Sequence, residues 1–157
     1  MTSLTRQEAR AAVRIELADI PPSANALRKS FVRNGKVMSA KTDAYSAWRE
    51  AAIWEIAAQR AGRIDGPYSL SIAVQRNWRS KRARDIDNII KPVSDALVKA
   101  GVVKDDSLAE RVTAQWVDDL DGPAVVVEIA AADTWEHISQ PLARVVAAIP
   151  HPSRGAA

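Results

Sequence analysis

The chain has 157 residues, a length that fits one domain of common size rather than two. Apolar residues make up 47% and charged residues 26%, with a net charge of only +3, so a disordered chain, a collagen-like repeat and a coiled coil along the whole length are excluded. Because there is no cysteine, disulfide scaffolds, thiolate catalysis and cysteine-ligated metal sites are excluded as well.

Histidines and long apolar segments are also scarce. The two histidines, His137 and His151, both lie near the C-terminus, so we expect neither a histidine metal site nor a Ser-His-Asp triad. The apolar runs are too short to span a bilayer, and the first residues lack the apolar core of a signal peptide. We therefore expect a cytoplasmic protein.

The start of the chain predicts a strand and then a hairpin. Apolar and polar residues alternate over 13–17, which is the period of a half-buried strand, and Pro21-Pro22 follows it. Further on, Asn34-Gly35 separates the short runs 31–33 and 36–38. This is the strongest short-range signal of a hairpin, because a type I′ turn needs positive φ at both central residues.

A helical pattern covers residues 42–61. Thr42 or Asp43 is the expected cap, and Gly62 is a natural stop. The spacing of the larger side chains predicts a buried stripe, to which we assign Tyr45, Trp48, Ala52, Ile56 and also Trp54.

The second half of the chain predicts three strands and one helix. Residues 68–74 alternate as a strand does, and 112–116 and 124–130 also have strand composition, the last apolar enough to be central. A helix follows the first of these strands, with Asp87 as its cap and Gly101 as its stop. We expect the last two strands to form a hairpin, which makes the sheet mixed.

This order of elements predicts an α/β (α+β) fold, with a small mixed β-sheet, a β-hairpin and two main helices. The character of the chain changes after residue 132, where apolar residues at helical spacing predict an extra C-terminal helix over 139–149 and a disordered end. We therefore divide the chain into a domain at 1–132 and a C-terminal extension at 133–157. The apolar face of the extension is expected to pack within the molecule or at a dimer interface.

A cationic strip follows the strand at 68–74. Five basic side chains fall within nine residues, namely Arg76, Arg79, Lys81, Arg82 and Arg84. Such a strip attracts a polyanion, and the planar fork of arginine binds two phosphate oxygens at once. Taken alone, the strip fits a solvated loop better than a polyanion site, and only the carboxylates next to it favour a function.

Carboxylates next to this strip point to chemistry. Asp85 and Asp87 lie at the junction of strand and helix, and Lys91 follows Asp87 by one helical turn. Asp105-Asp106 comes after the glycine that ends the helix and directly before the next strand. A hard divalent cation such as Mg²⁺ prefers a few carboxylate oxygens and leaves its remaining positions to water and phosphate. The pattern therefore predicts a Mg²⁺ site that activates water for attack on a phosphodiester.

Each member of this group also has a structural interpretation. Asp87 alone is equally well explained as a helix cap, and Asp105-Asp106 alone is better explained as a turn before a strand. Lys91 alone fits a surface lysine paired with Asp87 or Asp95.

The motifs together resemble the RusA family of Holliday-junction endonucleases. The resemblance covers residues 13–130 and lies in RARDIDNIIK at 82–91, DAL at 95–97, AGVV at 100–103, DDS at 105–107 and the earlier PPSAN at 21–25. It implies a homodimeric, Mg²⁺-dependent endonuclease of bacterial or prophage origin, with Mn²⁺ as an alternative ion, which resolves four-way DNA junctions by paired symmetric nicks in recombination and repair. By this resemblance 1–132 is a RusA-like endonuclease domain.

The resemblance also implies roles for individual residues. The essential acids are Asp85, Asp87 and Asp106, with Asp105 as a secondary metal ligand and Lys91 as the functional lysine. Contacts to DNA are expected from Asn25, Lys29, Arg76, Arg79, Lys81, Arg82 and Arg84, with Arg28, Arg33 and Lys36 as further candidates.

Three other functions stay open from the sequence. A nuclease of phage or prophage origin that acts broadly on flaps and forks uses the same acids. A junction-binding module without catalysis binds DNA independently of metal. An α/β protein unrelated to nucleic acids uses its acids only as caps and turns, and does not bind DNA at all.

Overall fold

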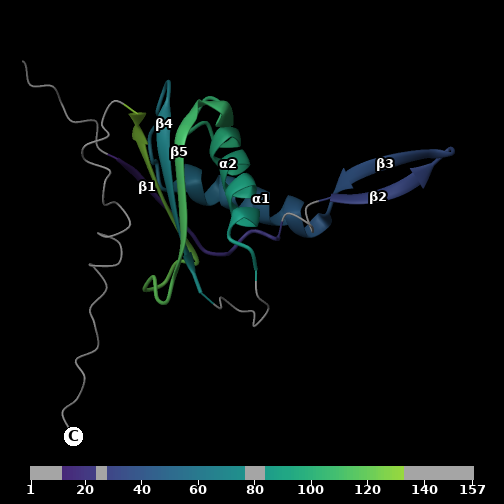
Figure 1. Cartoon of the computed structure of the whole chain (residues 1–157), viewed down its shortest axis with the longest axis horizontal. Coiled ribbons are helices and arrows are strands. Elements are labelled where there is room, and N and C mark those ends of the chain that lie inside the picture. The colour runs from purple at the N-terminus through teal and green to yellow at the C-terminus, as the bar shows by residue number, and fades with distance from the viewer. Residues whose placement is uncertain (1–11, 24–27, 77–83, 133–157) are drawn as a thin grey trace, which may run out of the picture.

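The computed structural model describes residues 12–23, 28–76 and 84–132 (Figure 1). Its elements in chain order are β1 (Val13–Leu17), β2 (Arg28–Arg33), β3 (Lys36–Lys41), α1 (Asp43–Ala58), β4 (Tyr68–Gln75), α2 (Asp87–Lys99), the short 3-10 helix η2 (Asp106–Leu108), β5 (Ala109–Val117) and β6 (Val125–Ala131). The predicted α+β class is therefore confirmed. The predicted helix at 139–149 and the rest of the extension lie outside the described residues.

The main sheet is mixed, as predicted, but the expected hairpin between the last two strands is wrong. The strand order is β1-β6-β4-β5, so β4 separates β5 from β6. β4 pairs with β5 in parallel and with β6 antiparallel, and β6 pairs antiparallel with β1. The reason is that α2 carries the chain back along the sheet, so that β5 joins β4 as the second strand of a β-α-β unit. The apolar β6 then fills the central position on the other side of β4, where its residues are almost all buried.

The side chain of Gln75 holds the connection that carries the chain from β5 across the end of β4 to β6. Its Nε2 donates to the carbonyl of Asp118 at 2.6 Å, and its Oε1 accepts from the amide of Leu120 at 2.6 Å. The backbone amide of Gln75 donates to the carbonyl of Ala124 at 2.8 Å. The Gln75 side chain thus supplies hydrogen-bond partners for two backbone groups of this turn, which lie outside the paired strands.

Both helices cover the same face of this sheet (Figure 1). Alternate residues of β4 and β6 form one buried cluster with apolar residues of α1 and α2. The opposite face carries a smaller buried cluster of Ala73, Val117, Leu120 and Val126. Within the described ranges, no helix is both long and apolar enough to cross a membrane.

Helix α1 begins as predicted and ends earlier than predicted. The Thr42 hydroxyl caps it by accepting from the amide of Tyr45 at 3.3 Å. Four of the predicted stripe residues are buried, whereas Trp54 is 76% exposed, so its assignment to the stripe was wrong. Two residues correspond to about 200° around a helix, which places Trp54 opposite Ala52 and Ile56. The helix stops at Ala58 because the chain turns into the left-handed region at Arg60, with φ 49°.

The predicted hairpin is confirmed and is longer than its sequence signal. β2 and β3 form a separate two-stranded sheet, in which Arg28 pairs with Lys41 and Arg33 with Lys36. Asn34 and Gly35 have φ values of 51° and 72°, the left-handed conformations that the turn requires. The hairpin projects away from the main sheet (Figure 1).

Candidate active site

The first pair of predicted acids lies at the start of α2. Asp85 precedes the helix, its backbone carbonyl accepts from the amide of Asn88 at 3.2 Å, and Asp87 is the first helical residue. Both aspartates are exposed. The expectation that Asp87 caps the helix was wrong, because Ile86 occupies the cap position and there is no side-chain cap hydrogen bond. The Asp87 carboxylate is instead placed in the first turn, where the helix dipole favours an anion.

The second pair of acids is positioned by the end of α2. At Gly101, with φ 77°, the chain reverses, and the amides of Gly101 and Val102 donate back to the carbonyls of Val98 and Leu97. Asp105 then caps η2, its Oδ1 accepting from the amide of Ser107 at 2.8 Å. These hydrogen bonds from Ser107 hold the pKa of Asp105 below its usual value. Asp105 therefore fulfils the structural role of a turn former.

Lys91 connects the two segments that carry the acids. Its Nζ lies 2.7 Å from Oδ2 of Asp106 in η2 and 2.8 Å from Oδ1 of Asp95, one turn further along α2. Hydrogen bonds to Asp106 and Asp95 raise the pKa of Lys91 above its ordinary value. The lysine therefore stays protonated across the neutral range, and can act as a hydrogen-bond donor and a fixed positive charge.

The sequence did not predict that the residues around Lys91 also contact α1. The hydroxyl of Tyr45 donates to Oδ2 of Asp95 at 3.2 Å, so a chain of contacts runs from Tyr45 through Asp95 and Lys91 to Asp106. Burial, with the charge of Asp95, raises the pKa of Tyr45. The spacing of four residues between Lys91 and Asp95 was visible in the sequence, whereas the contact with Tyr45 depends on how α1 packs against α2.

The aspartates match the donor chemistry of a hard divalent cation, but they do not form a ready-made cluster. Among the described residues, no three histidine, cysteine, aspartate or glutamate side chains gather closely enough to hold a metal ion. Mg²⁺ is usually bound through one or two protein carboxylates together with water and substrate phosphates. Exposed carboxylates on two adjoining segments fit that mode of binding.

The predicted DNA contacts fall into three groups. Lys29 is exposed on β2. Arg76 and Arg84 make contacts within the protein, since Nε of Arg76 lies 3.0 Å from Oδ1 of Asp118, and Nη1 of Arg84 donates to the carbonyl of Pro21 at 3.1 Å. The other four of the seven predicted residues, Asn25, Arg79, Lys81 and Arg82, lie outside the described residues. The further candidates Arg28, Arg33 and Lys36 are exposed on β2 and β3.

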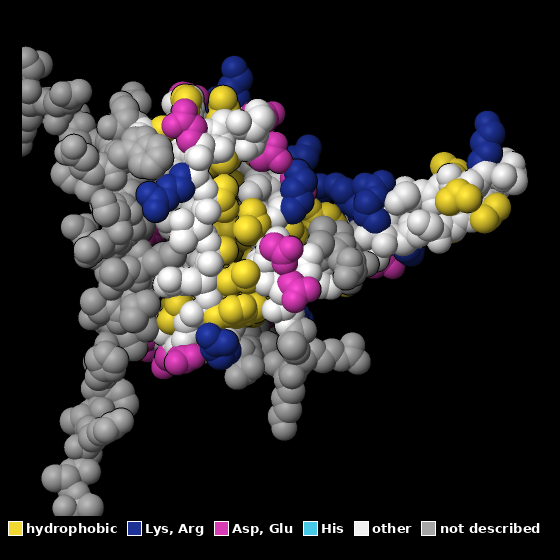
Figure 2. Space-filling model, in the orientation of Figure 1, with side chains coloured by type: hydrophobic (Ala, Val, Ile, Leu, Met, Phe, Trp, Pro, Cys, Tyr) yellow, Lys and Arg dark blue, Asp and Glu magenta, His cyan; other side chains and the backbone are white. Residues whose placement is uncertain are grey.

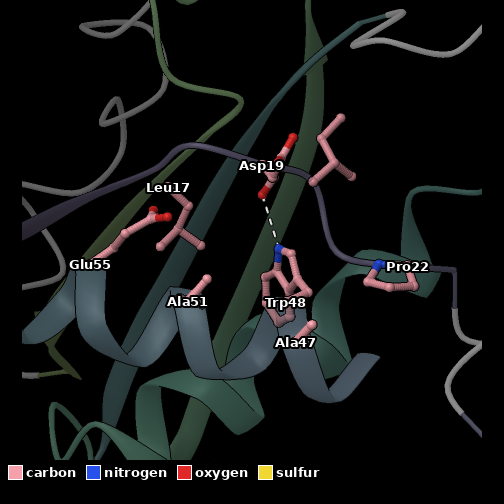
Figure 3. Close-up of a pocket in the computed structure, with 9 residues that line it drawn as sticks. Leu17, Asp19, Pro22, Ala47, Trp48, Ala51 and Glu55 are labelled. Atoms are coloured by element: carbon pink, nitrogen blue, oxygen red, sulfur yellow. Dashed lines mark hydrogen bonds between the residues drawn. The ribbon is translucent and has the colours of Figure 1, made fainter. Parts of the chain in front are cut away.

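A pocket of about 380 Å³ lies between α1 and the segment that follows β1 (Figure 3). Leu17, Ala51 and Ala52 supply part of its apolar lining. The indole Nε1 of Trp48 donates to the carbonyl of Asp19 at 3.1 Å, which fixes this segment against the helix (Figure 3). None of the predicted catalytic or metal-binding residues lines the pocket. The hydrogen bond from Arg84 to the carbonyl of Pro21 places the Pro21-Pro22 segment beside the residue that precedes Asp85.

Two comparisons with known proteins agree. A family model described as Endodeoxyribonuclease RusA matches residues 19–130, a range that contains Lys91 and all four predicted aspartates. A curated protein from Aquifex aeolicus (strain VF5), named Crossover junction endodeoxyribonuclease RusA, is 39% identical over 77 residues. That alignment covers 48% of this chain and 58% of the relative, so the chain spans less than two thirds of the relative's length.

Proposed function

The chain belongs to the RusA endodeoxyribonuclease family, and from this premise we propose that it is a Mg²⁺-dependent endonuclease that resolves Holliday junctions by paired symmetric nicks. The curated relative carries a name that refers to crossover junctions, which supports a four-way substrate. The proposed reaction is direct hydrolysis of a phosphodiester by water, without a covalent intermediate between protein and DNA.

The observation that carries this proposal is the ion pair between Lys91 and Asp106. It joins Asp106 of η2 to α2, the helix that begins at Asp87 and that Asp85 precedes, although its two partners are 15 positions apart in the chain. As an isolated surface pair it contributes little to stability, because the Lys91 and Asp106 side chains are 61% and 42% exposed. A protonated lysine beside carboxylates that bind a cation can stabilise the negative charge that develops on a phosphate during cleavage. That role explains its position better than a contribution to folding stability does.

The residues proposed to hold Mg²⁺ are Asp85, Asp87 and Asp106, with Asp105 as a secondary ligand and Mn²⁺ as an alternative ion. When bound, the ion neutralises charge on the scissile phosphate and lowers the pKa of the attacking water. Lys91 remains protonated and donates a hydrogen bond to a phosphate oxygen as negative charge develops on it. Asp106 and Asp95 orient the ammonium group for that contact.

Two copies of the chain are needed for paired nicks. A four-way junction presents two equivalent strands related by a two-fold axis, so two active sites with the same symmetry cut both strands in the same geometry. We therefore include a homodimer in the proposal. Exposed arginines and lysines supply phosphate contacts, while the shape of the branch, rather than base edges, supplies selectivity.

A nicking assay on a synthetic four-way junction tests the proposal. The natural chain is compared in Mg²⁺ and in EDTA with Asp87→Asn and with the matched control Asp43→Asn. Asp43 and Asp87 are both exposed and both begin a helix, so each substitution removes a similar interaction with a helix dipole. We expect Asp87→Asn to slow metal-dependent nicking by about 100-fold or more, and Asp43→Asn to leave it unchanged.

Other outcomes would redirect the assignment. Equal cleavage of junctions, flaps and forks favours a broad branched-DNA nuclease. Junction binding without cleavage in Mg²⁺ or Mn²⁺ favours a binding module. If Asp87→Asn and Asp43→Asn nick the junction equally fast, Asp87 has no role in the proposed site.

A further inference from the structure

The β2–β3 hairpin is cationic and carries exposed apolar side chains (Figure 2). Residues 28–41 include no aspartate or glutamate and five basic residues, which are Arg28, Lys29, Arg33, Lys36 and Lys41. Phe31 and Met38, which are paired across the strands, are 41% and 45% exposed. A two-stranded hairpin without further packing is only marginally stable in water, so a surface of this kind gains from a partner that covers it.

The strand register separates the hairpin into two different faces. Because side chains alternate along a strand, the pair Phe31–Met38 shares one face with Lys29 and with the pair Arg33–Lys36. The apolar pair is therefore flanked by positive charge on both sides along the hairpin. We call this the Phe31 face.

The opposite face presents the pair Val32–Val37, and its basic side chains, Arg28 and Lys41, contact other residues of the protein. There, Nε of Arg28 donates to Oγ of Ser39 at 2.9 Å, and Nζ of Lys41 lies 5.8 Å from the centre of the Tyr45 ring. On the Phe31 face, the side chains of Lys29, Arg33 and Lys36 make no hydrogen bond or ion pair with any described residue. Its three charges are thus available to an anionic partner.

We propose that the Phe31 face binds DNA at the branch point, where Phe31 and Met38 contact unstacked bases and the flanking cations contact phosphates. This rests on the proposed function, which supplies branched DNA as the substrate. Apolar side chains of this kind insert between base steps in DNA-binding proteins, and aromatic rings stack on exposed bases irrespective of sequence. Taking a base out of the stack costs free energy, and the cost is least where its pairing or stacking is already disturbed.

The charge of the hairpin favours DNA over a second copy of this face. Two Phe31 faces brought together would oppose three cations with three cations, which disfavours association. The hairpin is also joined to the candidate active site, since Lys41 lies over Tyr45 and Tyr45 donates to Asp95, the partner of Lys91. A hairpin engaged at the branch point would therefore be linked through α1 to the residues proposed to cut the adjacent strand.

The test uses the full chain and a four-way junction with 2-aminopurine at the crossover, with Ca²⁺ in place of Mg²⁺ so that binding is observed without cleavage. We expect a rise in 2-aminopurine fluorescence on binding that is lost in Phe31→Ala and retained in Phe31→Trp. Phe31→Ala is also expected to bind the junction about tenfold more weakly and a duplex of equal length within about twofold of the natural chain. The matched control is Val32→Ala, which truncates the adjacent residue on the opposite face, itself 71% exposed.

The outcomes separate this inference from the proposed function. Tight junction binding without a fluorescence rise, or equal losses in Phe31→Ala and Val32→Ala, overturns the role of the Phe31 face and leaves the nuclease assignment intact. A change of oligomeric state in Phe31→Ala without DNA assigns the face to a second copy instead. If nicking in Mg²⁺ and binding of every DNA substrate both fail, the proposed function itself is overturned.

Discussion

Replacing Lys91 with methionine distinguishes a catalytic lysine from a surface ion pair. Methionine preserves most of the length and the helix propensity of the side chain while it removes the charge. In the structure, Lys91 Nζ lies 2.7 Å from Asp106 and 2.8 Å from Asp95, so the substitution removes two ion pairs at once. We expect nicking of a four-way junction to fall by a large factor while the stability of the fold changes little.

The geometry sets both magnitudes. The side chains of Lys91, Asp106 and Asp95 are 61%, 42% and 34% exposed, and exposed pairs contribute about 0–1 kcal/mol to the free energy of unfolding. The pair with Asp95 gains little from its position on the helix, because a base that precedes an acid by four residues is the less favourable orientation. Loss of a preorganised donor to a developing oxyanion, in contrast, costs about 10²–10³ in rate, or about 3–4 kcal/mol.

The assay measures single-turnover nicking and unfolding on the same preparations. Lys99→Met is the control, since Lys99 is an exposed lysine in the last turn of the same helix. Junction binding is measured in parallel, because loss of a phosphate contact alone would weaken affinity and leave the rate of bound complexes unchanged.

Two results would refute this reasoning. A nicking rate for Lys91→Met within threefold of the Lys99→Met control would assign Lys91 to the surface pair only. A loss of unfolding free energy well above about 1 kcal/mol would show that the ion pairs are structural, and the rate could then not be interpreted as a catalytic effect. Partial recovery by Lys91→Arg would show that charge, more than its exact placement, is required.

Two further predictions concern the fold. Gln75→Ala removes both side-chain hydrogen bonds to the connection between β5 and β6, so we expect a loss of about 1–3 kcal/mol in urea unfolding, and an unchanged midpoint would contradict the role assigned to Gln75. The chain has two tyrosines, Tyr45 and Tyr68, and burial is the main cause that raises the pKa of each above the ordinary value of 10. Their protonated hydroxyls therefore contribute stability that is fully present below pH 10 and is lost as the pH rises through the pKa of the folded state. In a pH titration, absorbance at 295 nm should therefore show that tyrosinate forms only above pH 10, in the same pH range in which the protein unfolds. Formation of tyrosinate at pH 10 while the protein stays folded would contradict this prediction.

The elements that the sequence predicted well depend on local chemistry. Asn34-Gly35 specifies its turn because few other dipeptides adopt positive φ twice, and Thr42 caps α1 through atoms three residues away. The prediction that Trp54 is buried was wrong because its large apolar side chain suggested burial, whereas its angle around the helix places it on the exposed side.

The order of strands in the sheet could not be obtained in the same way. Residues 109–117 and 125–131 follow each other with a short connection, and such neighbours usually pair. What separates them is the insertion of β6 between β1 and β4, and this depends on the parallel return of β5 after α2 and on Gln75 at the end of β4. These are contacts between segments about 40 residues apart, which no local pattern records.

The candidate site combines both situations. Asp85, Asp87 and Lys91 lie within two helical turns, so their proximity follows from the sequence, whereas the approach of Asp106 to Lys91 requires that the chain reverse at Gly101 and return along α2. A local hydrogen bond from the amide of Ser107 engages Asp105 but not Asp106, and thereby distinguishes two adjacent acids that the sequence presents as equivalent. Asp105 holds the turn, and Asp106 faces the lysine. If that division is functional as well as structural, Asp105→Ala should chiefly lower the free energy of unfolding, because it removes the acceptor of the Ser107 amide. Asp106→Asn should instead chiefly lower the nicking rate, because it removes the carboxylate that orients Lys91.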